Sequence, residues 1–450
     1  MSAAVLGAAL GAALAGALGE RLGRRRALLL ADAAFALGAA AQGAAQGVAA
    51  LLLGRALVGL GVGVASAVVP LFIAECAPQA SRGGLVTVNV MFITGGQLVA
   101  YASNLAFARL AGNWRWMLGA AALPALAQAA GLCFVPESPR WLMRCGGRRH
   151  EAADALARLR EPDEARRELE AIEKELTDEA ERVTGEEQTL LADVAGGRVH
   201  RVRPAWSELF SSPEARYALF VAAGLQAFQQ LVGINTGMPT KARLLAGSAM
   251  LDCQSDTALA VMYYSAQILR LAGVGDNETA LQYGLVISAG NVVGTVVGLL
   301  LIDRLGRRPL ALWSLAGCFA SLCVLALSFH APRPDGALAF AGLCGYILCF
   351  SPGMGPVPWA VQSEVFPPRM RSAGTGVATF VNWAFNFAVA QTFLSMVDGI
   401  GKAGTFACFA GLTAVAFAFV LCAVPETKGL SLDEVTHLLR ACARGRSLRP

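Results

Sequence analysis

The sequence predicts an all-helical protein that crosses a membrane many times and is built from two related halves. Hydrophobic residues make up 55% of the 450-residue chain and charged residues only 15%, whereas soluble domains carry about 25% charged residues. Apolar runs of about 20 residues, enough to cross a bilayer core, recur along the chain. An acid followed by Arg-Leu-Gly-Arg-Arg occurs at residues 20–25 and again at 303–308, each time where an apolar run ends. This repeated cationic turn indicates a duplicated membrane protein.

The apolar runs define the expected transmembrane spans. Residues 1–19 count as a span with the N-terminus outside, because the basic cluster follows this run, whereas in a signal peptide it would precede it. The remaining spans are separated by short polar turns. In chain order, the expected spans are 1–19, 27–46, 48–72, 84–108, 115–135, 216–236, 262–274, 280–302, 309–329, 337–361, 373–397 and 404–424.

The polar segment 143–212 divides the spans into two bundles, at 1–142 and 213–430, and a tail follows at 431–450. Its Glu-, Arg-, Leu- and Ala-rich part is typical of amphipathic surface helices. The basic residues of the chain cluster in loops on the same side as this segment. The positive-inside rule places that side in the cytoplasm.

Composition excludes several classes of function. The eleven cysteines are scattered without a Cys-x-x-Cys pair, and the four histidines lie in loops or at span ends. We therefore expect no metal site and no bound cofactor. The sequence has no P-loop, no dinucleotide fingerprint after a strand and no nucleophile–base motif, so we expect neither ATP-driven transport nor an enzyme. The positive net charge lies in membrane-flanking loops and does not indicate nucleic-acid binding.

The helix count before each cationic turn differs between the halves. One span precedes the first turn, whereas two precede the second if 216–236 and 262–274 are parts of one helix. By this comparison the chain lacks its first transmembrane helix. The segment 237–260 interrupts the later helix with two basic and two acidic residues. Four charges in the bilayer would cost on the order of 10 kcal/mol, so this insert is expected to loop into water.

Two explanations of these anomalies stay open. The insert 237–260 is translated intron and Met1 an internal start in a truncated gene model, or both features belong to a receptor or regulatory membrane protein. A spliced message that joins Thr236 to Val261 supports the first explanation, and a message that retains the segment contradicts it for the insert.

Motifs along almost the whole chain resemble those of the sugar porter branch of the major facilitator superfamily. The finer pattern around residues 93–97, 114–119 and 352–356 resembles proton-coupled myo-inositol transporters. One such motif is weak evidence, but their number and order are specific. The motifs are the two cationic turns, Gly54-Arg55 with Gly59-x-Gly61-x-Gly63, Pro70 with Glu75, residues 136–142 (PESPRWL), Gln229-Gln230-x-x-Gly233-Ile234-Asn235, Gly355-Pro356-x-x-Trp359 with Ser363-Glu364, and residues 425–429 (PETKG).

The resemblance implies a polyol or sugar site inside the bundle. Amide side chains both donate and accept hydrogen bonds, so they can bind hydroxyl groups without charge. The alternative for any one amide is a bond between helices. Tyr263 and Tyr264 are expected to gate the site from outside, the alternative being an interfacial aromatic belt. The expected substrate contacts are Gln97, Gln229, Gln230, Asn235, Asn291, Trp359, Asn382 and Asn386.

Charged residues at the span ends are a second group that the resemblance marks. It implies a cytoplasmic salt-bridge network that holds the inner side closed in the outward-open state, and the alternative for any single charge is topology signalling. The members are Glu20, Arg21, Arg24, Glu75, Glu137, Arg140, Asp303, Arg304, Arg307, Glu364 and Arg371.

Arg55 stands apart because it lies inside an apolar span, where a charge usually has a function and a partner. In proton-coupled relatives the matching arginine pairs with an aspartate of the first helix, so Arg55 is the expected proton-coupling residue. Asp32 lies near the cytoplasmic end of its span and is a poor substitute for that partner.

The function expected from these observations is proton-coupled symport of myo-inositol or a related polyol or sugar by alternating access. A facilitative hexose carrier of the same fold and a transport-dead receptor are the alternatives. The proton gradient is the expected driving force. The expected partners are the polyol or sugar, protons and the lipid bilayer, and the protein is expected to be a monomer in the plasma or vacuolar membrane.

Overall fold

The computed structural model describes residues 2–78, 82–107, 113–144, 148–174, 177, 209–234, 277–330, 335–367, 370–430 and 432–444. These residues are helical and contain no strand, which confirms the predicted all-helical class. The expected insert 237–260 and the expected span 262–274 lie outside the described residues. Five of the described helical segments are long and apolar enough to cross a membrane.

The first half contains six helices that match the expected spans before residue 143. The expected span 115–135 is divided by a turn at Ala121 into two shorter helices. The helices are α1 (Ser2–Leu22), α2 (Arg24–Gly43), α3 (Val48–Cys76), α4 (Arg82–Phe107), α5 (Asn113–Ala120) and α6 (Ala122–Leu132).

Small residues let α1 and α3 pack with their backbones in contact. A Cβ atom at Gly59 or Gly63 of α3 would overlap the carbonyl oxygen of Ala4 or Ala8 of α1. Membrane helices associate without a hydrophobic driving force between them, so such close backbone approach supplies much of the packing. The glycine spacing of the motif therefore sets how α3 sits against α1.

The second half is also a bundle of helices, and turns at 351–356 and at Gly401 interrupt these helices. Its helices are α11 (Pro213–Gln229), the π-helix η1 (Gln230–Ile234), α13 (Asn277–Leu305), α14 (Arg307–Ser328), α15 (Gly336–Phe350), α16 (Val357–Val365) and α17 (Arg371–Ala423).

α17 runs through both of the expected spans 373–397 and 404–424, and the chain turns between them at Gly401, where φ is 75°. The expected span 337–361 is not continuous. A turn at 351–356 separates α15 from α16, because Pro352 and Pro356 lack the N–H groups that an unbroken helix needs.

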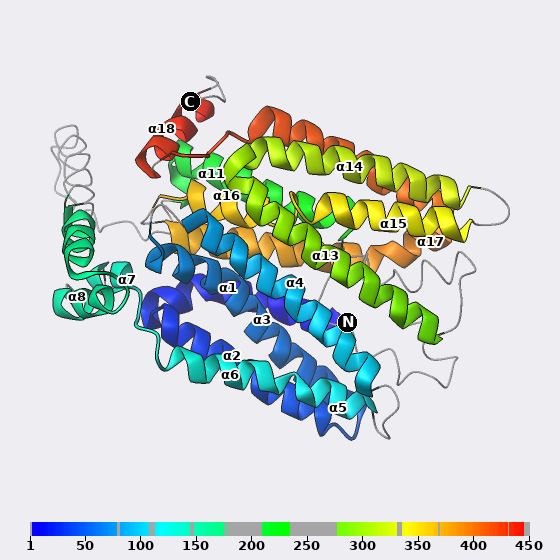
Figure 1. Cartoon of the computed structure of the whole chain (residues 1–450), viewed down its shortest axis with the longest axis horizontal. Coiled ribbons are helices and arrows are strands. Elements are labelled where there is room, and N and C mark those ends of the chain that lie inside the picture. The colour runs from blue at the N-terminus through cyan, green and yellow to red at the C-terminus, as the bar shows by residue number, and fades with distance from the viewer. Residues whose placement is uncertain are drawn as a thin grey trace, which may run out of the picture.

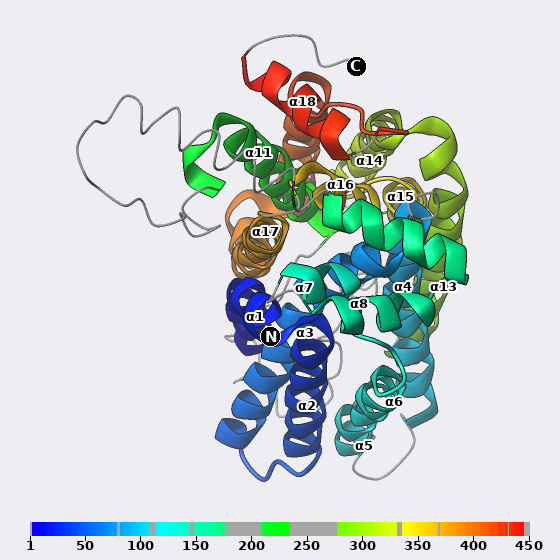
Figure 2. The ribbon, with the colours of Figure 1, turned by 90° about the vertical axis from the view of Figure 1, so that its left-hand side faces the viewer.

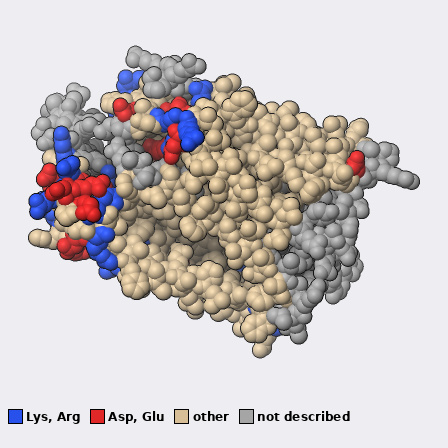
Figure 3. Space-filling view, viewed as in Figure 1, with Lys and Arg blue, Asp and Glu red and all other residues tan. Residues whose placement is uncertain are grey.

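The two halves lie side by side, with α1 against α17 and α4 against α13 (Figure 1). The short helices α7 (Pro139–Arg144), α8 (Arg149–Ala157) and α18 (Leu432–Ala443) gather at one end of the bundle (Figures 1 and 2). Charged side chains on the face shown in Figure 3 cluster at this end, and the rest of that face is almost uncharged. This distribution agrees with the predicted cytoplasmic side.

Candidate functional site

The candidate site begins where α11 changes from an α-helix to the π-helix η1. Gln226, Gln229 and Gln230 follow one another on this segment and are at most 5% exposed. A π-turn widens the helix and displaces its backbone bonds, and such turns occur often at functional sites. The hydroxyl of Tyr346 donates to the carbonyl oxygen of Val232 at 3.2 Å, which satisfies a backbone group of the widened turn.

The turn between α15 and α16 holds Gln229 through backbone carbonyls. Gln229 Nε2 donates to the carbonyl oxygens of Met354 at 2.8 Å and Gly355 at 2.9 Å. The residue four positions after Met354 is Pro358, which has no N–H to occupy that carbonyl in a helix. The prolines of this motif therefore leave acceptors that a glutamine side chain can use.

Asn382 of α17 completes this amide cluster. Its Nδ2 donates to Gln226 Oε1 at 2.6 Å and to Gln229 Oε1 at 2.9 Å. Gln226 Nε2 donates to Gln362 Oε1 at 2.7 Å. The structure thus joins two of the predicted contact residues, Gln229 and Asn382, and adds Gln226 and Gln362, which the sequence analysis did not select.

A second polar cluster joins the two halves. Asn291 Nδ2 of α13 donates to Gln97 Oε1 of α4 at 3.2 Å, and the Ser351 hydroxyl contacts Asn291 Oδ1 at 2.5 Å. Gln97 is 4% exposed, and its Nε2 atom has no hydrogen-bond partner among the described residues. A buried amide N–H without an acceptor carries an energetic cost that a ligand oxygen would remove.

The other predicted contact residues fall into two groups. Gln230 is 4% exposed on η1, whereas Trp359 and Asn386 are half-buried on α16 and α17. Asn235, Tyr263 and Tyr264 lie outside the described residues, so their expected roles stay predictions.

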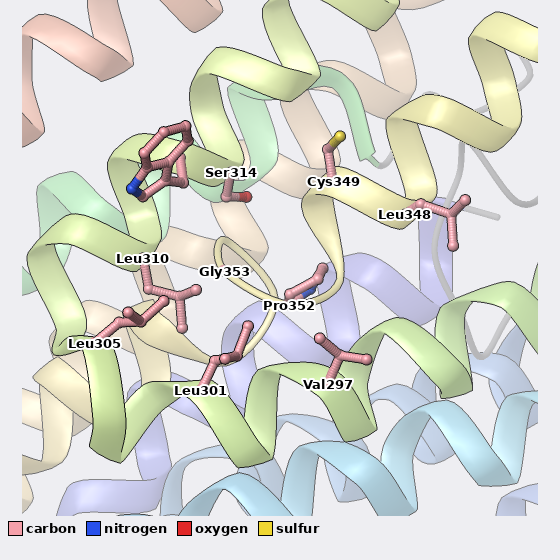
Figure 4. Close-up of a pocket in the computed structure, with 10 residues that line it drawn as sticks. Val297, Leu301, Leu305, Leu310, Ser314, Leu348, Cys349, Pro352 and Gly353 are labelled. Atoms are coloured by element: carbon pink, nitrogen blue, oxygen red, sulfur yellow. The ribbon is translucent and has the colours of Figure 1, made fainter.

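A cavity of about 440 Å³ lies between α13, α14 and α15 but is distinct from the amide clusters (Figure 4). Its lining is almost wholly apolar, and Trp313 and Leu348 in it are 75% and 51% exposed. The cavity therefore opens toward the lipid side and offers little to a hydroxylated ligand. It touches the 351–356 turn at Pro352 and Gly353.

The first cationic turn is built around Gly23, whose φ of 92° favours glycine. The backbone N–H groups of Arg24 and Arg25 donate to the Glu137 carboxylate at 2.9–3.1 Å. The Arg24 guanidinium bonds both oxygens of Glu75 at 2.8 Å. Ser138 donates to the same Glu75 carboxylate. One turn thereby links α2, α3 and the start of α7.

The second cationic turn repeats these contacts around Gly306, whose φ is 95°. The N–H groups of Arg307 and Arg308 donate to Glu426 at 3.0 Å, and Arg307 pairs with Glu364 at 2.9 Å. Two members of this group were not selected from sequence. Glu426 follows a proline, as Glu137 does. Thr427 donates to Glu364, as Ser138 donates to Glu75. A comparison of the Pro-Glu-Ser and Pro-Glu-Thr motifs in the sequence would therefore have identified Glu426 and Thr427.

The remaining predicted charges lie near these turns. Asp303 pairs with Arg307 at 3.1 Å, and the Arg304 carbonyl accepts from Lys428 Nζ at 2.7 Å. The Glu20 carbonyl accepts from Trp141 Nε1 at 2.9 Å. The pairs Arg24–Glu75, Arg307–Glu364 and Asp303–Arg307 each lie within one half. Further network residues are Arg21, which is exposed, Arg140, which is half-buried, and Arg371, which is 3% exposed and donates to the Phe366 carbonyl.

Arg55 lies within α3 and is 3% exposed, as expected for a functional intramembrane charge. Asp32, on the neighbouring helix α2, is 6% exposed, and its Oδ2 atom has no hydrogen-bond partner among the described residues. The structure therefore places two ionisable side chains inside the first half.

Comparison with known proteins identifies relatives over nearly the whole chain. The family model described as "Sugar (and other) transporter" matches residues 1–241 and 237–439, two ranges that meet within the expected insert. "Probable inositol transporter 2" of Arabidopsis thaliana is 35% identical and is matched by 98% of this chain over 83% of its length. "Proton myo-inositol cotransporter" of Homo sapiens is 33% identical, with 94% of this chain and 72% of the relative covered.

A solved structure shows the same arrangement of helices. The proton:xylose symporter XylE bound to 6-bromo-6-deoxy-D-glucose superposes with a TM-score of 0.78 at 26% identity, and the match covers 97% of this chain and 88% of that one.

Proposed function

The chain belongs to the sugar porter family of the major facilitator superfamily, and we propose that it is a proton-coupled symporter of myo-inositol or a related polyol. Members of this family are integral membrane transporters and not enzymes. The relatives named above, an inositol transporter and a proton myo-inositol cotransporter, support the choice of substrate.

One observation carries the choice of a neutral, hydroxylated ligand. The two polar clusters described above consist of amide and hydroxyl side chains, and Gln97 of the first half has a buried Nε2 atom without a hydrogen-bond partner among the described residues. Amides bind hydroxyl groups in both directions without placing a charge in the membrane. In secondary transporters the substrate site lies where the two repeats meet, and Gln97 and Asn291 join the halves at such a place.

The driving force in this proposal is a proton gradient, with no bound cofactor. Arg55 supports coupling because an arginine inside the bilayer costs about 2.5–3.5 kcal/mol on insertion scales and is retained chiefly where it acts. Protonation of a group that interacts with Arg55 would alter the balance between the two conformations of the transporter. The protein would act as a monomer in the plasma or vacuolar membrane.

Transport by purified protein in liposomes tests this function. We expect labelled myo-inositol to accumulate against its gradient when the lumen is made alkaline, and the accumulation to collapse with an uncoupler. Uptake that equilibrates but ignores the proton gradient supports a facilitative carrier instead. Binding without counterflow supports a receptor.

A pair of variants ties that result to the amide site. Gln97→Leu should weaken uptake at low substrate concentration by about tenfold or more, because one amide bond to a hydroxyl is lost. Gln128→Leu is the matched control, since Gln128 is an exposed amide on α6, away from both polar clusters. Equal loss in the two variants would contradict the assignment of the site.

A further inference from the structure

A chain of buried polar side chains lies behind the predicted contact residues. Gln362 of α16 is 1% exposed, and its Nε2 donates to Thr379 Oγ1 of α17 at 3.1 Å. Its Oε1 accepts from Nε2 of Gln226 at 2.7 Å. Gln226 and Thr379 are both fully buried. Gln362 thus links Gln226 to Thr379, and through Gln226 the chain reaches Asn382.

The hydrogen bonds of this chain run in one direction, and the backbone fixes that direction. Carbonyl oxygens only accept, so Gln229 must turn its Nε2 toward Met354 and Gly355 and its Oε1 toward Asn382. Asn382 must then present Nδ2 to Gln229. The same Nδ2 also bonds Gln226 Oε1 at 2.6 Å, so both N–H bonds of Asn382 are used inside the protein.

The same donor-to-acceptor order continues from Gln226 through Gln362 to Thr379. Because Gln226 accepts with Oε1, its Nε2 must donate, and Gln362 Oε1 receives it. Gln362 Nε2 is then left to donate to the Thr379 hydroxyl. Turning any one of these amides would bring two donors or two acceptors face to face in a buried place, which the low local dielectric makes costly.

We propose that Gln226, Gln362 and Thr379 are positioning residues that hold Asn382 with its Oδ1 atom toward the ligand. Asn382 then acts only as an acceptor and requires a ligand hydroxyl that donates a proton. Gln97, whose buried Nε2 has no acceptor among the described residues, requires an oxygen that accepts. The site therefore selects its ligand by the direction of its hydrogen bonds as well as by shape. This inference rests on the proposed function, since it assumes a hydroxylated ligand between the halves.

The test compares ligands that differ in donor capacity at one ring position. A fluorine in place of a hydroxyl accepts weakly and cannot donate, so a series of monofluorinated myo-inositols is assayed against myo-inositol by binding to purified protein and by counterflow. The wild type should prefer the hydroxyl over fluorine by about tenfold or more at one position, as expected for a lost bond to a buried polar group.

Gln362→Leu should reduce that preference at least about threefold, because Gln226 then has no acceptor for its Nε2 and can turn this donor toward Asn382, where it competes with Gln229 for the orientation of Asn382. Thr379→Val should act in the same direction, and Thr379→Ser, which keeps the hydroxyl, should restore the wild-type preference. Thr413→Val is the control: Thr413 is fully buried in α17 and donates to the Phe409 carbonyl of its own helix.

A merely structural role gives a different result. If the variants weaken binding of the hydroxyl and fluoro ligands by the same factor, or if the preference is unchanged in Gln362→Leu, the positioning role is wrong. Should Gln362→Leu fail to fold, the pair Thr379→Val and Thr379→Ser decides alone.

A different result would overturn the proposed function. A wild type that binds no inositol overturns the assigned substrate, and the same variants are then assayed with D-glucose and D-xylose against their fluoro derivatives. A wild type that binds neither series overturns both proposals.

Discussion

The two cationic turns make nearly the same contacts at the ends of the two halves. In each, a glycine with positive φ lets two successive N–H groups bind a glutamate that follows a proline, Glu137 in one and Glu426 in the other. In each, the first arginine after the glycine pairs with a second glutamate, which also accepts a hydroxyl. The repeat in the sequence therefore records a repeated three-dimensional unit and is more than a topology signal.

The two halves have similar cationic turns at their ends but different residues in their interiors. Asp32 lies nine residues after Gly23, whereas the residue nine after Gly306 is Leu315. Arg55 lies 20 residues before Glu75, whereas the residue 20 before Glu364 is Cys344. Among the described residues, the first half carries the buried charges that lie away from the cationic turns, Asp32 and Arg55, and the second half carries most of the buried amides. This contrast supports coupling in the first half and a larger share of the ligand contacts in the second.

Removing the charge of Arg55, which has no counterpart in the second half, should have the largest effect on transport. We expect Arg55→Leu to abolish accumulation driven by a proton gradient while exchange of labelled substrate continues, because binding depends on the amide side chains of the two polar clusters and not on this charge. Cys344→Leu, at the corresponding place in the second half, should leave both intact. Accumulation by Arg55→Leu at the wild-type level would contradict the division of roles.

The two arginine–glutamate pairs should differ in their contribution to stability. Arg24 and Glu75 are 3% and 5% exposed and bond through both oxygens, whereas Arg307 and Glu364 are 7% and 17% exposed. Leaving a buried charge without its partner costs about 3–5 kcal/mol, and less where water can reach it. Arg24→Ala should therefore lower the thermal midpoint in detergent further than Arg307→Ala. Equal losses would mean that burial does not decide the contribution of the pair.

The glycines of the turns should respond alike. Alanine at Gly23 or Gly306 is strained by the positive φ, at about 1–2 kcal/mol, and its Cβ would press on Glu137 or Glu426. Gly131→Ala in α6 meets no atom within 4 Å and serves as the control. A midpoint unchanged in Gly23→Ala but lowered in Gly306→Ala would break the equivalence of the two turns.

The smallest effect is expected at the exposed pair of Arg149 and Glu173, outside the bundle. The hydrogen bond from Arg149 lowers the pKa of Glu173. Any stabilisation is present above the unfolded pKa of the carboxyl group and is lost as the pH falls through the folded pKa. Since solvent screens exposed pairs, Glu173→Gln should melt with the wild type at neutral pH. A clear drop in the thermal midpoint of Glu173→Gln would show that the ion pair between Arg149 and Glu173 stabilises the bundle.

Much of the architecture follows from periodicity and composition. Apolar runs and basic turns predicted the helices, the two halves and the charged end, because membrane insertion depends on these properties alone. The break at 351–356 was missed, although its prolines signal it, because hydropathy does not register missing N–H donors. Arg24 and Glu75 were assigned to one group from the sequence, but their pairing within one half needed the three-dimensional structure.

The sequence predicted only those site residues that belong to a recognisable motif or to the family resemblance. The motif marked Gln229, and the resemblance marked Asn382, but Gln226 lies among apolar neighbours and Gln362 lies at a position that the Trp359 to Glu364 motif leaves unspecified. Their role depends on three helices meeting, which a single sequence does not show. Asn235, Tyr263 and Tyr264 stay predictions because they lie outside the described residues.

Uptake of labelled myo-inositol into proteoliposomes that hold the purified full chain, with and without an imposed proton gradient, tests the central claim most directly. We predict accumulation above the external concentration when the lumen is alkaline and equilibration alone when an uncoupler is present. Uptake that is the same with and without the gradient, or no uptake of myo-inositol by protein that is folded and inserted, would contradict it.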